Sequence, residues 1–314
     1  MPVPTRAALA AIRAQPWAIL PEYLDAIEAL AERAMAAEVL QVLAGDGHAA
    51  RHAANLDAVA ATGSPLEGAR YATVRDGTAV VPLFGPIFPR ANLVNASAGG
   101  TALDAVMRDF RVAQGSTAVD RVLLLVDSPG GVVSGLGEAA EAIRGAGKPV
   151  TAFVTGIAAS AAYWLASQAA EIVAESSASV GSIGVVMSMS RQVQPGSDGR
   201  QAYEITSSGA PRKRPDPSTD EGRAAMQEYV DALEDVFVAD VAASRKKTPA
   251  YVRREFGQGG MLSAARAVEV GMADRIGTLE ATLNGLARRA GPSQQPNRRA
   301  MAERDLDMRQ RRAS

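Results

Sequence analysis

The chain of 314 residues has no cysteine, which excludes disulfide bonds, thiol catalysis and cysteine-ligated zinc. This agrees with a reducing compartment. Aromatic residues make up only 4% of the sequence, whereas alanine and glycine are abundant, and such a composition favours the close helix–sheet contacts of an α/β protein. The formal net charge of -1 lacks the basic excess on which nucleic-acid binding depends. We therefore expect no nucleic-acid partner.

Long apolar runs are also missing. Near the N-terminus, Arg6 and Arg13 interrupt every stretch that could serve as the apolar part of a signal peptide. No window reaches the roughly 20 apolar residues that a membrane-spanning helix needs. The sequence therefore predicts a soluble chain of the cytoplasm, without a stable membrane span.

Histidine is scarce, with His48 and His52 standing four residues apart. That spacing could place both on one side of a helix, but no carboxylate motif lies nearby to complete a metal site. A packed or solvated pair is the better interpretation. We expect neither a bound metal nor a cofactor.

The pattern of the chain divides it into three regions. Residues 1–70 are predicted to be an N-terminal helical region, with a helix that opens at Leu20-Pro21-Glu22. Residues 71–289 alternate apolar runs with alanine-rich stretches, which indicates α/β architecture with parallel strands. Residues 290–314 are polar and rich in arginine, as in a flexible tail. We expect strands at 78–84, 121–126, 149–154 and 184–189, and helices at 101–114, 136–146, 160–169, 217–245 (capped by Ser218) and 263–270.

Three short segments could carry chemistry. Asp127–Gly131 (DSPGG) follows a predicted buried strand, and its glycines let the backbone present N–H groups to a ligand. Gly156–Trp164 (GIAASAAYW) places Ser160 at the start of a predicted helix, where the helix dipole and free N–H groups could hold an oxyanion. On the residues alone, a cap or a small residue in tight helix packing explains this serine somewhat better than catalysis does. Ala178–Gly184 (ASVGSIG) by itself indicates only a turn.

Elimination narrows the choice of a base for Ser160. Both histidines lie outside the α/β region and the G-x-S-x-G motif is absent, so a Ser–His–Asp triad is not expected. Lysine is the natural alternative. The chain has four lysines, and Lys213 lies in a Gly/Pro-bounded loop between Arg212 and Arg214. Burial and neighbouring cations would favour the neutral lysine that a base requires, although a solvated basic loop is the commoner fate of such a run.

Taken in order, these segments resemble the signal peptide peptidase A family of serine peptidases. They are most similar to its branch with minor capsid protein C and the head-maturation (prohead) proteases of tailed bacteriophages. The resemblance extends from about Gly77 to Leu286. It rests on VDSPGG (126–131), GIAASAAYW (156–164), ASVGSIGV (178–185), SSGAPRK (207–213) and ARAVEVGMADRIG (265–277).

The resemblance implies a Ser–Lys dyad, with Ser160 as the nucleophile and Lys213 as its base. It also implies an oxyanion hole formed by the N–H groups of Gly131 and Ala161. Ser182 would hydrogen-bond and orient the lysine. The implied fold is a ClpP/crotonase-like spiral of ββα units, to which the helical region 1–70 is added.

The same resemblance implies a ring-shaped homo-oligomer that cleaves polypeptides, either scaffold and capsid proteins during head maturation or released signal peptides. Capsid or portal proteins would be its partners, in the bacterial host cytoplasm or inside a phage procapsid. We expect the substrate to lie along an exposed strand near Thr78–Phe84 by β-addition. The Ala- and Gly-rich surroundings suggest a small side chain before the cleaved bond.

Two alternatives stay open. A crotonase-type acyl-CoA enzyme would share the fold and its glycine-rich turns, but no Asp or Glu lies between Lys148 and Ala170 to serve such a site. A non-catalytic capsid assembly or scaffold component is favoured by the spacing of the base. Strict S-G-x-x-K spacing falls on Arg212, which stays protonated and cannot be a base. A loop one residue longer brings in Lys213, and we prefer that interpretation.

Overall fold

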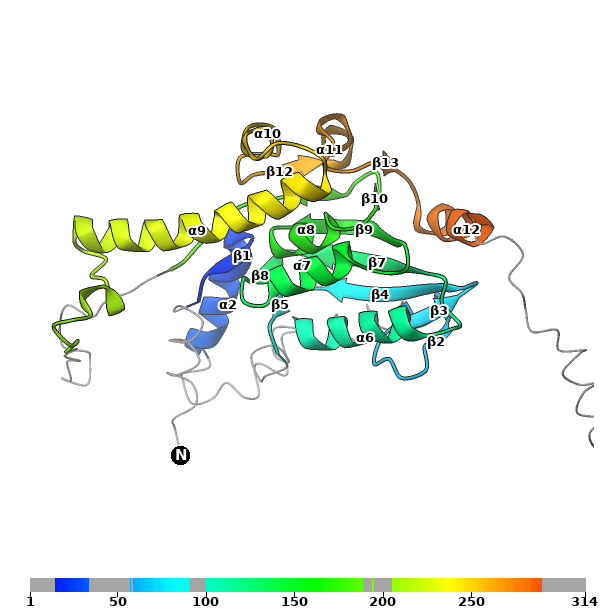
Figure 1. Cartoon of the computed structure of the whole chain (residues 1–314), viewed down its shortest axis with the longest axis horizontal. Coiled ribbons are helices and arrows are strands. Elements are labelled where there is room, and N and C mark those ends of the chain that lie inside the picture. Colours follow the sequence, from blue (N-terminus) through cyan, green and yellow to red (C-terminus); the bar gives the residue numbers. More distant parts are fainter. Residues whose placement is uncertain are drawn as a thin grey trace, which may run out of the picture.

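A computed structural model describes residues 15–33, 57, 59–90, 100–188, 194 and 205–289. His48, His52, much of region 1–70 and the whole tail 290–314 lie outside these residues, so the division into three regions stays a prediction. Figure 1 shows helices packed around mostly parallel strands. In the described part of the chain, no helix is both long and apolar enough to cross a lipid bilayer.

The described residues form two sheets, and the larger has nine strands, in the order β12-β11-β9-β7-β4-β3-β2, with β10 and β13 branching off beside β9. β9 pairs in parallel with β7, β10 and β11. This parallel centre with flanking helices confirms the predicted α/β class. The strands are β2 (Ser64–Pro65), β3 (Thr73–Arg75), β4 (Thr78–Phe84), β7 (Arg121–Ser128), β9 (Val150–Ala159), β10 (Glu171–Ala174), β11 (Ser179–Gly181), β12 (Met261–Ser263) and β13 (Arg275–Ile276).

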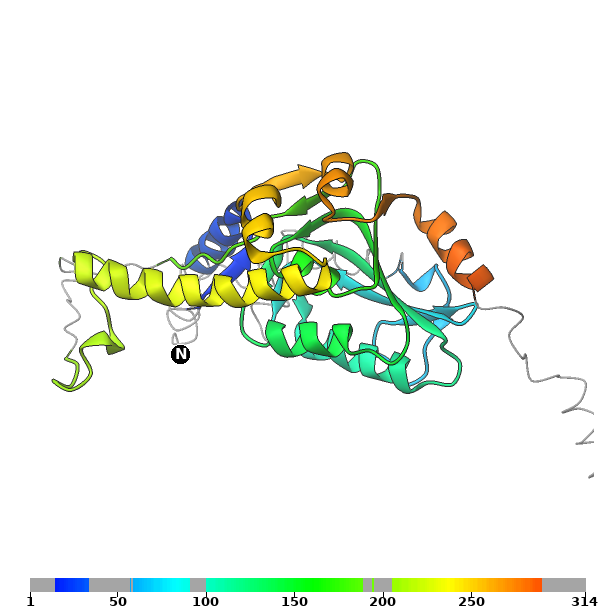
Figure 2. The same cartoon turned by 45° about the horizontal axis from the view of Figure 1, so that its top comes forward.

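Near-continuous apolar runs place the central strands of this sheet between two apolar layers. Along β4, Ala79 and Val81 belong to one buried cluster, whereas Val80 belongs to another on the opposite face. Figure 2 shows the sheet with helices on both sides. The first cluster includes residues of α6 (Leu103–Gly115), α7 (Leu136–Arg144) and α8 (Ala161–Ala166), and the second includes residues of α12 (Leu279–Arg289).

A smaller sheet continues from β7 and has the strand order β1-β8-β5-β6. Its apolar cluster includes Trp17, Ile19 and Phe88, and the Trp17 and Phe88 rings meet edge to face at 5.9 Å. The same cluster holds the first turns of α2 (Pro21–Arg33) against the sheet, through Leu24 and Ile27. The strands are β1 (Trp17–Ile19), β5 (Ile87–Phe88), β6 (Thr101–Ala102) and β8 (Gly130–Val132).

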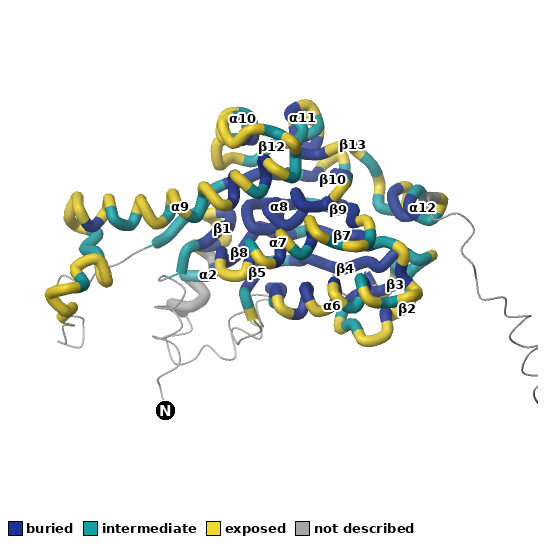
Figure 3. The backbone as a smooth tube through the Cα atoms, viewed as in Figure 1, coloured by how far each residue is buried: buried dark blue, intermediate teal, exposed yellow. Residues whose placement is uncertain are grey.

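Residues 205–236 form an arm, which comprises the loop before helix α9 (Asp220–Ser244) and the larger, N-terminal part of that helix. The second half of α9 packs on the body through buried residues such as Phe237 and Val241. The first half projects away from both sheets and is largely exposed (Figure 3). The short turn η1 (Pro211–Lys213) precedes α9, and α10 (Pro249–Glu255) and α11 (Ala264–Val270) follow it.

Most predicted elements are confirmed, with shifted ends. The strands expected at 121–126 and 149–154 are longer, and the helix expected at 160–169 is limited to α8. The predicted strand 184–189 is wrong, because Val186 forms only an isolated β-bridge with Trp17 in its described residues. Ser218 is not the cap of α9. Thr219 is, because its Oγ1 accepts a hydrogen bond from the N–H of Gly222 at 3.0 Å.

Candidate functional site

Ser160 occupies the single residue between β9 and α8, where the chain reverses from strand to helix. Its backbone has φ 53° and ψ -116°, a left-handed conformation that costs a non-glycine residue about 1–3 kcal/mol. The side chain is 1% exposed, and its Oγ lies 3.4 Å from the carbonyl oxygen of Gly184. Strain of this kind at a buried serine is characteristic of functional sites.

Backbone hydrogen bonds on both sides hold Ser160 in this conformation. Its N–H donates to the carbonyl of Gly181 at 2.7 Å, and its own carbonyl accepts from Trp164 N–H at 2.8 Å. The residues around it are small, so α8 packs closely on β7 and β9. The N–H of Ala161, the first residue of α8, has no acceptor within the helix.

Gly130 and Gly131 lie next to Ser160. A Cβ atom on Gly130 would stand 3.0 Å from Ser160 Cβ, and Gly130 has φ 104°. A Cβ on Gly131 would lie 2.6 Å from the backbone carbonyl carbon of Ile87. Only glycine fits at these two positions, so β8, which carries the Gly131 N–H expected to bind the oxyanion, lies directly against the serine. We refer to β8 as the glycine strand.

Two polar side chains, to which the sequence pattern assigned no role, fix this glycine strand. Ser128 Oγ donates to the carbonyl of Gly85 at 2.7 Å and accepts from Gly130 N–H at 3.2 Å. Asp127 Oδ1 accepts from Ile157 N–H at 2.9 Å, at the point where the pairing of β7 with β9 shifts in register. The DSPGG motif therefore holds β8 in position relative to the end of β9.

Ser182 lies beside Ser160 at the end of the neighbouring strand. Ala159 and Gly181 are partners in the parallel pair β9–β11, so the residue after each stands at the same edge of the sheet. Ser182 is 7% exposed and has φ 52°, the second left-handed serine at this edge. The structure thus brings together Ser160, Ser182, Gly131 and Ala161.

Lys213 is not part of this group within one chain. It is exposed, in the turn η1 before α9. Its neighbour Arg212 bonds with Glu228 on α9, and Glu228 lies twelve residues, or about 18 Å of helix, before Asp240. Asp240 is one of the residues through which α9 contacts α8, the helix that follows Ser160. Figures 1 and 2 both show the loop before α9 far from α8.

The other lysines have different partners. Lys148 precedes β9, whereas Ser160 directly follows its last residue. The ten residues of β9 separate the two by about 33 Å. Its Nζ donates to the carbonyls of Ala113 and Ser116, and burial lowers its pKa. Lys247 Nζ stands over the ring of Tyr251, 4.8 Å from the centroid.

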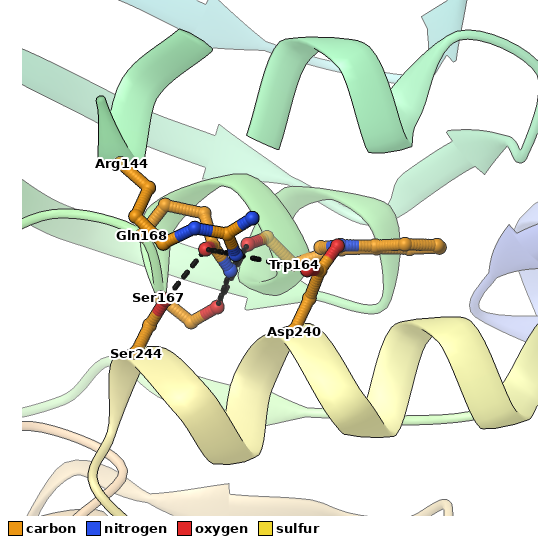
Figure 4. Close-up of polar contacts among 6 residues, drawn as sticks. All are labelled: Arg144, Trp164, Ser167, Gln168, Asp240 and Ser244. Carbon is orange, nitrogen blue, oxygen red and sulfur yellow. Dashed lines mark hydrogen bonds and ion pairs between the residues drawn. The ribbon is translucent and has the colours of Figure 1, made fainter. Parts of the chain in front are cut away.

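A polar network joins α8 to the second half of α9 (Figure 4). Trp164 Nε1 donates to Asp240 Oδ2 at 2.9 Å, and Arg144 Nη1 pairs with Asp240 Oδ1 at 2.8 Å. The rings of Trp164 and Phe237 stack at 4.5 Å. Gln168 completes the network, with bonds to Trp164, Ser167, Arg144 and Ser244.

The strand proposed from the sequence as an exposed substrate platform is not exposed. β4 (Thr78–Phe84) pairs with β7 along its whole length and with β3 at Thr78–Val80, and every one of its residues is buried. A peptide therefore has no free strand edge to join along Thr78–Val80. At the candidate site, β8 pairs with β1, a strand that the sequence pattern did not identify.

No group of histidine, aspartate and glutamate side chains that could hold a metal ion occurs among the described residues. Buried Tyr163, on α8, donates from its hydroxyl to the carbonyl of Met272 at 3.0 Å, and burial raises its pKa. The groups that can take part in chemistry here are the hydroxyl of Ser160, whose backbone is strained, the neighbouring backbone N–H groups and the second serine, Ser182.

Comparisons with known proteins point in the same direction. Residues 142–292 match the model of Peptidase family S49. The chain is 28% identical over 255 residues to Capsid assembly protease C of Escherichia phage lambda, covering 79% of this chain and 57% of that protein. It is 35% identical over 122 residues to the Head-tail preconnector protein GP5 of Enterobacteria phage P21, covering 38% of this chain and 24% of that protein. Protease 4 of Haemophilus influenzae is 27% identical over 197 residues, which cover 60% of this chain and 31% of that protein. The chain thus spans less than two thirds of each relative's length.

Proposed function

We propose that this chain is a serine endopeptidase with a Ser–Lys dyad, because residues 142–292 match the model of Peptidase family S49, a family of ClpP-like fold. Ser160 is the nucleophile and Lys213 is the general base. The observation that carries the proposal is the strained, buried Ser160 beside the Gly130–Gly131 strand. The similarity to proteases favours this activity over acyl-CoA chemistry and over a role in assembly alone.

The distance between arm and site leads us to propose that the dyad forms between two copies of the chain. The arm carries large apolar side chains to the surface, with Ile205 97% exposed and Tyr229 and Val236 each 50% exposed. A largely exposed helix with apolar side chains on its surface gains stability by packing on a neighbour. In a ring, each arm would bring Lys213 to the Ser160 of the next copy.

The reaction then proceeds by acyl transfer. Neutral Lys213 takes the proton of Ser160 Oγ as that oxygen attacks the peptide carbonyl carbon. The N–H groups of Gly131 and Ala161 stabilise the oxyanion, and Ser182 orients the lysine. The protonated lysine then gives its proton to the leaving amine. Water, deprotonated by the same lysine, hydrolyses the ester and restores the serine.

We propose polypeptides of a phage capsid or its scaffold as the substrates, because phage relatives carry the names of a capsid assembly protease and a head-tail preconnector protein. Released signal peptides, which the resemblance to the signal peptide peptidase A family implies, are the second candidate. Incubating the chain with scaffold protein or with a synthetic signal peptide, followed by mass spectrometry of the products, separates the two.

The test of the dyad is a mixing experiment. Ser160→Ala and Lys213→Ala should each abolish peptide cleavage, while Ser167→Ala, a buried serine of the same region that bonds only within its own turn, should keep most of it. Co-assembly of equal amounts of the two inactive variants should restore about a quarter of the wild-type activity, because half the serines survive and half of those meet a lysine. A mixture that stays inactive while forming mixed oligomers rejects the shared dyad. Undiminished cleavage by both single variants rejects the dyad itself.

A further inference from the structure

Strand β1 lies along β8, the strand that carries Gly130 and Gly131 beside Ser160. The two strands are antiparallel, with Ala18 opposite Gly131 and Ile19 opposite Gly130. Beyond the ends of β1, Leu20 N–H donates to Pro129 at 3.0 Å and Val133 N–H donates to Pro16 at 3.2 Å. These two bonds mark the hydrogen-bonded pairs of the ladder.

Hydrogen-bonded and non-hydrogen-bonded pairs alternate along an antiparallel ladder. Since the pairs Leu20–Pro129 and Pro16–Val133 are bonded, the pair between them, Ala18–Gly131, is bonded as well. The N–H of Gly131 therefore donates to the carbonyl oxygen of Ala18. That N–H is one of the two groups to which the proposed function assigns the oxyanion.

The position of Gly130 brings the same peptide group close to the nucleophile. A Cβ atom there would overlap the carbonyl oxygen of Ala18 and stand 2.9 Å from Ile19 Cα and 3.0 Å from Ser160 Cβ. The Ala18–Ile19 peptide group and the serine thus lie on the same side of Gly130. Ile19 Cα and Ser160 Cβ are therefore at most about 6 Å apart, so the peptide group that follows Ala18 is a neighbour of the nucleophile.

The other edge of β1 is also paired. Trp17 N–H donates to the carbonyl of Val186 at 2.8 Å, and Val186 N–H donates back to Trp17 at 2.7 Å. β1 therefore fills the space between β8 and the segment after Ser182. Extended peptides bind to exposed strand edges through such main-chain bonds, with side-chain pockets providing the selectivity.

Side chains anchor the segment on both faces. Trp17 and Ile19 are 1% and 3% exposed and pack with Phe88 of β5. Ala18 points the other way, is fully buried and belongs to the main core cluster. The position next to the reactive serine thus accepts a small side chain, and the positions on either side accept large apolar ones.

We propose that Pro16–Ile19 occupies the substrate cleft of its own chain in the way a substrate strand does, with Ala18 at the residue whose carbonyl is attacked. This inference rests on the proposed function for the identity of the cleft. Substrates taken from other proteins are then extended segments with a small residue at that position, flanked by large apolar residues. They enter only after β1 has left.

The absence of cysteine allows a direct test by disulfide trapping. Trp17 and Val132 form a non-hydrogen-bonded pair, in which Cα atoms stand about 4.5 Å apart, within the range that a disulfide spans. The variant Trp17→Cys with Val132→Cys should lock β1 in the cleft when oxidised and release it when reduced. Val74→Cys with Ala79→Cys, partners in β3 and β4 away from the cleft, is the matched control.

The readout is binding of a labelled octapeptide, QPWAILPE (residues 15–22), to each pair placed in a Ser160→Ala background, measured by fluorescence anisotropy. We expect the oxidised cleft pair to bind at least about tenfold more weakly than the reduced pair, because an occupied site lowers apparent affinity in proportion to its occupancy. The control pair should bind equally in both states. Equal binding by the oxidised and reduced cleft pair, or no binding by either, overturns the proposal.

Cleavage by the same pairs with Ser160 intact separates this proposal from the proposed function. Ser160-dependent cleavage at one rate in both redox states supports the peptidase and overturns occupation of the cleft by β1. Redox-dependent binding without any Ser160-dependent cleavage supports occupation and overturns the peptidase.

Discussion

Replacing Asp240 tests whether the contact between α8, the helix that follows Ser160, and the second half of α9 is an energetic anchor. Asp240 accepts the indole N–H of Trp164 with one oxygen and pairs with Arg144 through the other. Asp240→Ala removes both interactions, whereas Asp240→Asn keeps an amide oxygen for the indole and removes only the charge. The two variants therefore separate the hydrogen bond from the ion pair.

The size of each effect follows from burial. Trp164 is 2% exposed, and leaving a buried donor without an acceptor costs about 1–3 kcal/mol. The side chains of Arg144 and Asp240 are 40% and 19% exposed, so solvent reduces the contribution of the ion pair to about 0–1 kcal/mol. We expect Asp240→Ala to lower the free energy of unfolding by about 2–3 kcal/mol and Asp240→Asn by less than about 1 kcal/mol.

Urea denaturation at fixed protein concentration measures both variants, with an unchanged m-value as the sign that only stability has changed. Asp235→Ala is the control, because this acid lies on the same helix with its side chain 71% exposed and paired with Arg253. It should cost less than about 0.5 kcal/mol. Equal losses for Asp240→Ala and Asp240→Asn, or a loss for Asp235→Ala as large as that for Asp240→Ala, would refute the reasoning.

Two further predictions concern the site and its support. Gly130→Ala forces a side chain onto the carbonyl of Ala18 at φ 104°, so Ser160-dependent peptide cleavage should fall at least about 100-fold while circular dichroism still reports a folded chain. An unchanged rate would contradict the close approach of these strands. Burial raises the pKa of Tyr163 above its ordinary value of 10.0. The unfolded chain therefore loses the hydroxyl proton at a lower pH than the folded chain, so the stabilisation from the neutral, buried hydroxyl is full below pH 10 and is lost as the pH rises further. The melting temperature of Tyr163→Phe should therefore fall less steeply than that of the wild type between about pH 9 and 11, and parallel curves would contradict this.

Local patterns predicted the central strands well, because a strand buried on both faces must be apolar at every position. The run RVLLLV has that pattern, and it forms β7 between two helical layers. The ends of elements were harder, since they depend on single hydrogen bonds. Ser218 and Thr219 are equally good caps by residue type, and Ser218 is instead bonded to Asp216.

Long-range pairing was beyond the sequence patterns. The apolar run at 184–189 predicts a strand as well as β9 does, but pairing requires a partner, and Val186 pairs only with Trp17, which lies 169 residues earlier. The three residues of β1 are too few to show an alternating pattern. For the same reason the sequence could suggest Ser160 and Lys213 together, but not that α9 holds them apart in one chain.

Ser160, its glycine strand and Ser182 come from neighbouring strand ends, so folding of one chain is enough to assemble them. On our proposals, two conditions must still be met before cleavage begins. A neighbouring copy must bring Lys213, which makes the reaction depend on assembly. β1 must also leave the cleft, which requires breaking its main-chain bonds and exposing Trp17. An enzyme built in this way would be inactive as a single chain, and its activity should rise with protein concentration more steeply than in direct proportion. Specific activity that stays constant on dilution below the point at which oligomers dissociate would show that neither condition depends on assembly.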